Sequence, residues 1–243
     1  EEFLSGLPDV DEDEVLPSLG VLYSLNEKVS LYGSIAKNLE RGTGTGVITA
    51  NPNQQLPPVE SEQVEVGAKI ALSEELIMTL ALFDISRDYE YINEDNFYVS
   101  DGVQNHRGVE LIFTGAVNDR LTLYGGGYLI DAQVEDLSNQ PDAVPANIPE
   151  LQFSLRANYA LSEVLHVNGG VFHSSEKEVD VPNQRTIDAY TTVDVGASYD
   201  IAFRHFNLTL VGGVQNLLDE EYWQSPISVG SPRTVTFQLL ANY

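Results

Sequence analysis

Residues 192–201 read Thr192-Val-Asp-Val-Gly-Ala-Ser-Tyr-Asp-Ile201, and apolar and polar side chains alternate along this stretch one by one. Because successive side chains of a β-strand point to opposite faces, the alternation predicts a strand with one apolar face and one polar face. The same period of two returns at 151–159, 206–215 and 234–243. The chain is therefore predicted to be all-β.

Eleven segments carry this pattern, although both faces look apolar in the first half of 75–91. Single-chain bacterial barrels have an even number of strands. Either a strand near 1–15 escapes the pattern, or the chain supplies part of a larger barrel. The predicted strands are 16–25, 28–40, 62–72, 75–91, 96–117, 120–137, 148–161, 164–176, 187–201, 205–218 and 231–243.

The predicted connections alternate between short polar turns and longer links, as in outer-membrane barrels with short periplasmic turns and long extracellular loops. Several segments run to 13 residues or more, whereas strands of soluble proteins usually have about 3–10. An antiparallel transmembrane barrel segment is therefore favoured over a soluble β-sandwich. Tyrosines near predicted strand ends fit an interfacial girdle: Tyr89, Tyr91, Tyr98, Tyr159, Tyr190, Tyr222 and Tyr243.

Composition excludes several classes of protein. The formal charge of −25 argues against nucleic acid as a partner, since phosphates demand a basic surface. The chain has no cysteine and no run of 18 apolar residues for a transmembrane helix. It opens on Glu1 without a leader peptide or an initiator Met, which is expected of a mature chain or of a piece of a longer protein, and we favour the second.

Two segments near the end of the chain resemble those of TonB-dependent siderophore receptors. Val214-Gln-Asn-Leu-Leu-Asp-Glu-Glu-Tyr222 is similar to the family's "N-L-F/L-D-x-x-Y" segment, and Gly230-Ser-Pro-Arg233 to its "G-x-P-R" step into the last strand. Upstream, Gln104-Asn-His-Arg-Gly-Val-Glu110 resembles "R-G-x-E", and Tyr190-Thr-Thr-Val-Asp194 resembles "Y-x-x-x-D". Further matches begin upstream at Tyr32-Gly-Ser-Ile-Ala-Lys-Asn-Leu-Glu40, so the resemblance extends over nearly the whole chain.

The resemblance implies a 22-stranded barrel whose lumen is filled by a plug. Residues 1–243 would then be the C-terminal part of the barrel domain, without the plug. By the same resemblance, the whole protein imports ferric siderophores through the outer membrane of a Gram-negative cell, and the missing N-terminal plug region contacts TonB. Its partners would be a ferric siderophore, TonB and outer-membrane lipid.

Candidate ligand contacts are aromatic side chains in or beside the predicted loops, because an aromatic wall offers a bulky iron chelate a large rigid contact area. They are Tyr91, Phe97, Tyr98 and Trp223. A membrane girdle or packing within the loops is the alternative role for these rings. Arg107 and Arg233 are expected near the extracellular rim, where they pair with acidic loop residues rather than bind ligand.

No catalytic residue, metal ligand or cofactor is predicted, and an enzyme is not expected. A G-x-S-x-G elbow is lacking, and the histidines form no close i, i+4 pair. The acidic charge weakly favours a neutral hydroxamate-type chelate over an anionic catecholate. Two other functions stay open: a self-contained small barrel acting as a passive pore or structural protein, and a soluble β-sheet module that binds carbohydrate.

Overall fold

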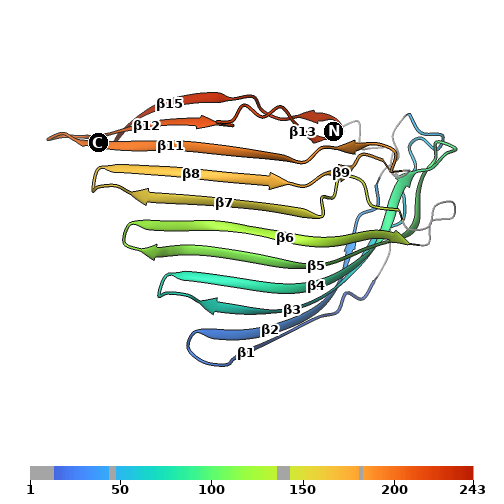
Figure 1. The fold of residues 1–243 in the computed structure, drawn as a ribbon. Coiled ribbons are helices and arrows are strands. Elements are labelled where there is room, and N and C mark those ends of the chain that lie inside the picture. Colours follow the sequence, from blue (N-terminus) through green and yellow to red (C-terminus); the bar gives the residue numbers. More distant parts are fainter. Residues whose placement is uncertain (1–13, 44–47, 136–142, 181–182, 243) are drawn as a thin grey trace.

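The computed structural model describes residues 14–43, 48–135, 143–180 and 183–242. Their main feature is one eleven-stranded antiparallel sheet in which each strand pairs with the next strand of the sheet along the chain (Figure 1). In spatial order its strands are β1 (Ser18–Ser24), β2 (Val29–Glu40), β3 (Val59–Ala71), β4 (Leu76–Ile92), β5 (Tyr98–Asn118), β6 (Leu121–Glu135), β7 (Leu151–Ala160), β8 (Leu165–Ser174), β11 (Tyr190–Ala202), β12 (Asn207–Gln215) and β15 (Thr234–Asn242).

The eleven predicted strands are confirmed, with differences only at their ends. Two further hairpins were not predicted: β9 (Lys177–Glu178) pairs with β10 (Thr186–Ile187), and β13 (Trp223–Ser225) pairs with β14 (Ser228–Val229). Strands of two or three residues are too short for a period of two to be recognised in the sequence. Both hairpins lie in long links between strands of the large sheet.

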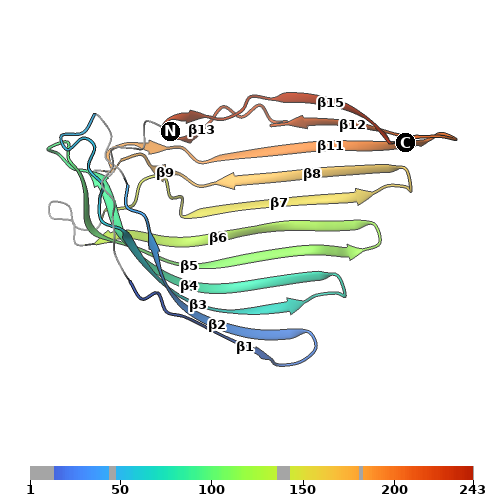
Figure 2. The same ribbon diagram turned by 180° about the vertical axis from the view of Figure 1, so that it is seen from behind.

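The predicted alternation of turns is also confirmed, with short turns at one end of the sheet and long links at the other (Figures 1 and 2). Asparagine and serine side chains close the short turns. Asn26 Oδ1 accepts hydrogen bonds from the backbone N–H groups of Lys28 and Val29, at 2.8 and 2.9 Å. Asn118 accepts two equivalent bonds. Such local bonds let the chain reverse within a few residues.

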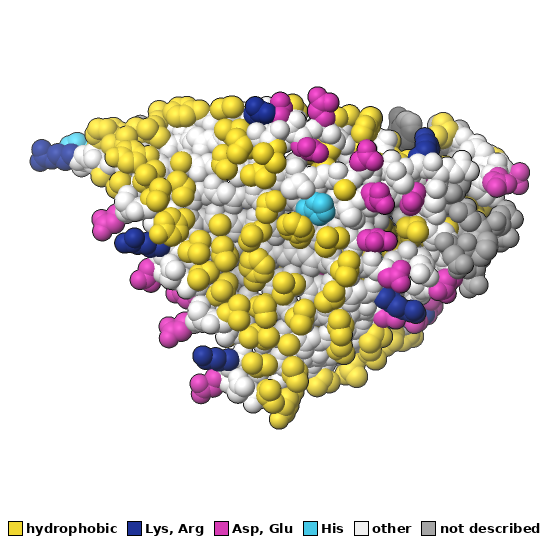
Figure 3. Space-filling model, viewed as in Figure 1, with side chains coloured by type: hydrophobic (Ala, Val, Ile, Leu, Met, Phe, Trp, Pro, Cys, Tyr) yellow, Lys and Arg dark blue, Asp and Glu magenta, His cyan; other side chains and the backbone are white. Residues whose placement is uncertain are grey.

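The sheet has an apolar face that is exposed. Leu31 pairs with Ala68, and Val66 with Leu82, so rows of apolar side chains continue from strand to strand. Hydrophobic atoms spread across the sheet in Figure 3, and charged groups gather toward its two ends. Leu82 is 57% exposed and Phe237 72%. In the described part of the chain no second layer covers this face, unlike the buried faces of a soluble sandwich.

One of the residues that make β4 look apolar on both faces, Phe83, is explained by a glycine on the neighbouring strand. Leu80 and Leu82 lie on the apolar face, whereas Phe83 lies on the opposite, polar face. A Cβ atom added to Gly108 of β5 would lie 2.7 Å from the Phe83 ring. The ring therefore fills the space above this glycine, which accounts for a large apolar residue on the polar face.

The predicted position in an interfacial girdle is wrong for two of the tyrosines. Tyr89 is only 8% exposed and packs with Val134 and Ala143, and Tyr190 is 6% exposed. Burial raises the pKa of the Tyr89 phenol. Tyr159, by contrast, lies on the apolar face near the short-turn end. Tyr243 lies outside the described residues.

Both edges of the sheet are open in the described residues. β1 pairs only with β2, and β15 only with β12. The side chains of β1 are exposed throughout the strand. No helix in the described ranges is long and apolar enough to span a membrane.

Candidate functional site

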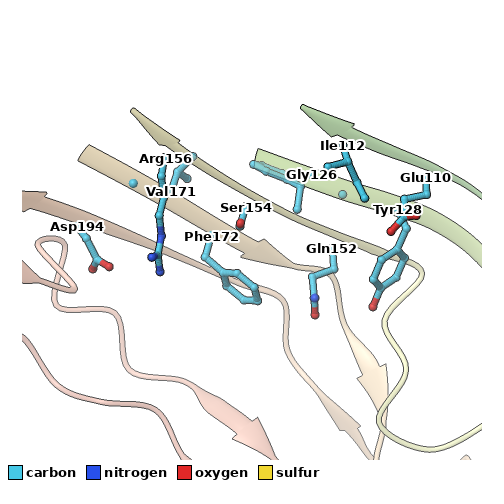
Figure 4. Close-up of a pocket in the computed structure, with 13 residues that line it drawn as sticks. Glu110, Ile112, Gly126, Tyr128, Gln152, Ser154, Arg156, Val171, Phe172 and Asp194 are labelled. Atoms are coloured by element: carbon cyan, nitrogen blue, oxygen red, sulfur yellow. The ribbon is translucent and has the colours of Figure 1, made fainter. Parts of the chain in front are cut away.

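The polar face of the sheet is hollowed between β5 and β11. One hollow of about 390 Å³ is lined by side chains that point away from the sheet (Figure 4). These include Glu110 of β5, Tyr128 of β6, Gln152, Ser154 and Arg156 of β7, Phe172 of β8 and Asp194 of β11. Its volume falls in the range of about 300–1,000 Å³ found for small-molecule sites.

A second hollow, of about 580 Å³, adjoins the first and shares Arg156, Gly170 and Asp194 with it. It extends toward the short-turn end and is lined mainly by amides and glycines. Its lining includes Asn158, Asn168, Gly196, Gly213, Gln215 and Thr236. The two hollows together are called the polar groove below.

Charged groups are few in the polar groove. The side chain of Arg156 passes over Gly170, where an added Cβ atom would lie 3.3 Å from its Cγ atom. Gly170 of β8 pairs with Arg156 of β7 on one side and with Asp194 of β11 on the other, so the three residues share one register row. Arg156 has no ion-pair partner within the described residues. One carboxylate oxygen of Asp194 accepts a hydrogen bond from the backbone N–H of Asn216, at 2.9 Å.

Asn216 is the buried centre of a cluster at the long-loop end of the sheet. Its side chain is buried, and its φ of 48° lies in the left-handed region, which Asn tolerates better than most residues. Its Nδ2 donates to the carbonyls of Glu220 (2.8 Å) and Ser231 (3.0 Å), and its Oδ1 accepts from Glu220 N–H (2.9 Å). Asn216 thus ties the loop after β12 to the residues before β15.

Other residues of the family-like segments 190–194, 214–222 and 230–233 complete this cluster. Asp219 pairs with the Arg233 guanidinium at 3.1 Å and accepts from its backbone N–H at 3.3 Å. The rings of Tyr222 and Tyr190 stack with centroids 4.1 Å apart. The N–H of Gly230 donates to Tyr222 O at 2.8 Å. The name rim cluster is used below for Tyr190, Asn216, Asp219, Tyr222, Gly230 and Arg233.

The predicted pairing with acidic loop residues is confirmed for Arg233 but not for Arg107. Arg233 pairs with Asp219 of the loop. Arg107 Nε lies 2.9 Å from Asp84 Oδ2, but this partner belongs to strand β4 rather than to a loop. Both groups of the second pair are more than half exposed, so the pair contributes little to stability.

Gly230→Ala is expected to destabilise the protein by about 1–3 kcal/mol, because the new methyl group overlaps a ring. Its Cβ atom would lie 2.3 Å from the Tyr222 ring, which is held against Tyr190. Gly212→Ala is the matched control, since its nearest neighbour would be 4.0 Å away. Thermal unfolding in detergent should give a lower midpoint for Gly230→Ala than for Gly212→Ala. Equal midpoints would show that the Tyr222 ring can move aside without a loss of stability.

The four predicted ligand contacts lie on two different hairpins. Tyr91 stacks on Tyr89 at 5.6 Å, and Phe97 is 43% exposed at the tip between β4 and β5. The backbone of Tyr98 is held by two hydrogen bonds to the Asn51 amide, each 2.9 Å. Trp223 is 53% exposed on the β13–β14 hairpin. Their role in binding stays a prediction.

The long links are fastened to one another. Lys177 is buried, and its Nζ donates to Gln224 O at 2.7 Å, which joins the β8–β11 link to β13. Burial lowers the pKa of this amine. Asn183 exchanges two hydrogen bonds of 2.9 Å with the backbone of Val144 in the β6–β7 link.

Acid is expected to loosen the β8–β11 link. Hydrogen bonds from Arg185 (2.8 Å) and from Gln184 N–H (3.1 Å) lower the pKa of Asp180. With a lowered pKa, the carboxylate favours the folded link above its ordinary pKa, and this contribution is lost as the pH falls through the lowered value. In Arg185→Gln the pKa of Asp180 in the folded link returns toward its ordinary value, so the acid-dependent loosening should be smaller. Hydrogen exchange of residues 175–189 across an acid titration measures this, and identical profiles would contradict it.

The polar groove was not predicted from the sequence, because its amides and hydroxyls alternate like any solvated strand face. The available signal was a set of glycines at polar-face positions of neighbouring strands, Gly126, Gly170, Gly196 and Gly213. No group of three or more His, Asp or Glu side chains in the described part of the chain is arranged to hold a metal ion.

Comparison with known proteins decides the family. The family model described as "TonB dependent receptor-like, beta-barrel" matches residues 3–217. The chain belongs to this family. Its members are outer-membrane barrels that bind ferric siderophores and interact with TonB. The match covers the ten strands β1–β8, β11 and β12 of the large sheet.

Two curated relatives of this TonB-dependent receptor chain are similar over nearly its full length. The metal-pseudopaline receptor CntO of Pseudomonas aeruginosa is 28% identical, with 93% of this chain and 33% of the relative covered. The ferrichrome receptor FcuA of Yersinia enterocolitica is 26% identical, with 99% and 34% covered. The chain thus spans about a third of the length of these relatives.

Solved receptors share the fold of this TonB-dependent receptor chain. The ferric preacinetobactin receptor BauA of Acinetobacter baumannii superposes with a TM-score of 0.81 at 24% identity, covering 99% of this chain and 38% of that one. The ferric citrate transporter FecA gives 0.76 at 20% identity, covering 93% and 38%.

Proposed function

We propose that this chain forms the C-terminal part of the barrel of an outer-membrane receptor that imports ferric siderophores. The exposed apolar face would contact lipid, and the polar face would line the lumen. The main support for this proposal is the exposed apolar face of a sheet whose strands are joined by short turns at one end and by long links at the other. Relatives named as receptors for ferrichrome and metal-pseudopaline support the substrate class.

The remaining strands of the barrel and a plug are proposed to come from outside residues 1–243. An open edge cannot face lipid, because its unpaired N–H and C=O groups find no partner there. β1 and β15 both have such an edge in the described residues. Eleven strands would be half of a 22-stranded barrel. The open edges also argue against a self-contained pore.

The substrate is proposed to be a ferric chelate without strong negative charge. The chain carries 37 acidic against 12 basic side chains, which disfavours the approach of an anionic catecholate chelate. Tyr91, Phe97, Tyr98 and Trp223 would supply aromatic contacts near the long links. Energy for transport would be delivered through TonB contacting the plug.

Uptake by the full-length protein tests this function. Cells that depend on it for iron would be given ferrichrome, ferric citrate or a ferric tricatecholate, each labelled with radioactive iron. We expect TonB-dependent uptake of ferrichrome in preference to the other two. Uptake that persists without TonB, or no uptake of any chelate, would contradict the proposal.

A further inference from the structure

The most buried side chains of the described residues lie among the long links and at the long-loop end of the sheet, with Leu76 and Ala81 as the exceptions. Val134, Ala143 and Asn216 are among them. Elsewhere the described sheet is a single layer with an exposed apolar face. The core of the described chain is therefore built where the links meet, and not within the sheet.

The first two links at the long-loop end hold each other. The N–H of Ala50 in the β2–β3 link donates to Asn96 O at the β4–β5 tip, at 2.7 Å, and Asn96 Nδ2 donates to Ile48 O at 2.9 Å. The Glu90 carboxylate of β4 accepts from the N–H and the hydroxyl of Thr43, at 3.1 and 2.6 Å. The β2–β3 link therefore cannot leave the β4–β5 hairpin without breaking these four bonds.

Contacts of the same kind continue to the next two links. Tyr89 of β4 packs with Ala143 of the β6–β7 link, and its phenol is hydrogen-bonded to the backbone of Ala146. The N–H of Asn147 donates to Glu178 O in the β8–β11 link, at 2.7 Å. Tyr89 thus attaches the β4–β5 hairpin to the β6–β7 link, which is attached in turn to the β8–β11 link.

The two bonds between Asn183 and Val144 strengthen the last of these attachments, and the bond from Lys177 to Gln224 adds the β12–β15 link. Each link is therefore attached to its neighbours in the series. A segment that closes over a ligand needs the opposite, namely few buried contacts and a low free energy of opening. The name loop collar is used below for the described residues of the five links: 41–43, 48–58, 93–97, 143–150, 175–180, 183–189 and 216–233.

We propose that the loop collar is one preformed unit, which receives the chelate at a fixed mouth without closing any of its links over the ligand. A preformed mouth loses less conformational entropy on binding than a mobile one does. Any loop closure during uptake would come from parts of the protein outside residues 1–243. The role toward the chelate rests on the proposed function, whereas the unity of the collar does not.

Hydrogen exchange of the full-length protein in detergent tests the unity of the collar. Asn183→Gly removes bonds between two links but suits the backbone, since the φ of Asn183 is 51°. In one unit, amides at 88–98 and 222–230 should exchange about tenfold faster, together with those at 143–150. Faster exchange confined to 143–150 and 183–189, or no change at all, would overturn the proposal.

Asn53→Gly is the matched control. Asn53 also has a positive φ, of 59°, and its exposed side chain joins no other link in the described part of the chain. This variant should leave exchange at 143–150 and 222–230 as it is in the wild type. If both segments exchanged faster here as well, the effect would be a general loosening rather than transmission between fastened links, and the proposal would fail.

A pair of spin labels on the full-length protein tests the fixed mouth. Asp95→Cys at the β4–β5 tip and Ile227→Cys beside β14 carry the labels, since both positions are exposed and this chain has no cysteine of its own. Ferrichrome should leave the distance between the labels unchanged. A shift of more than about 2 Å, the size of a loop rearrangement, would overturn the proposal. Failure of the unlabelled wild type to take up any of the three chelates named above would instead overturn the proposed function, and the exchange result would still decide the unity of the collar.

Discussion

Leu111→Arg is expected to destabilise the membrane-embedded barrel by about 2–4 kcal/mol, the cost of an arginine on the lipid face near the bilayer midplane. Leu111 pairs with Leu80 on the apolar face, and its chain neighbour Ile112 points to the polar face. The two side chains are equally accessible, at 39% and 41%. Accessible area alone therefore predicts the same effect for both.

Ile112→Arg is the matched control. Its guanidinium would enter the polar groove beside Glu110, so its cost should be much smaller than that of Leu111→Arg. Urea unfolding of the two full-length variants in lipid vesicles measures the difference. Equal destabilisation, or a larger loss for Ile112→Arg, would reverse the assignment of the two faces.

Asn216→Ala is expected to cost about 3 kcal/mol, because it leaves partly buried backbone groups without their partner. The side chain makes three hydrogen bonds of 2.8–3.0 Å in the rim cluster. Alanine is also disfavoured at a φ of 48°. Thermal unfolding of the full-length protein in detergent would show the loss as a lowered midpoint.

Two further variants separate the causes of this loss. Asn216→Gly removes the hydrogen bonds but suits the positive φ, so it should recover only a minor part of the stability. Asn158→Ala truncates an exposed asparagine of the polar face and should change stability by about 0.5 kcal/mol or less. A midpoint for Asn216→Gly equal to that of the wild type would show that backbone strain, and not hydrogen bonding, gives Asn216 its importance.

The sheet could be predicted because lipid and lumen impose opposite demands on neighbouring side chains. Val193 and Val195 face one way and Asp194 the other, as the alternation in 192–201 indicated. The turns were predictable for a similar reason, since Asn118 and Ser162 close them with local hydrogen bonds. Both signals depend only on residues close together in the sequence.

The groove and the roles of the motif residues depend on contacts that the sequence does not display. In the sequence Asp194 looks like one more polar-face residue, yet it accepts a hydrogen bond from the backbone N–H of Asn216 in the loop after β12. The sequence predicts that Tyr190 is an interfacial tyrosine, but its ring is buried against Tyr222. Whether a glycine leaves a hollow depends on the ring beside it, as Gly108 under Phe83 shows.

Spin labels placed one at a time at residues 109–114 of β5, in the full-length protein in lipid vesicles, test the central claim most directly. Collisions with oxygen, which concentrates in the bilayer, should peak at 109, 111 and 113. Collisions with a water-soluble nickel complex should peak at 110, 112 and 114. Profiles that rise and fall together, or that alternate in the opposite phase, would contradict the claim that the apolar face meets lipid and the polar face lines the lumen.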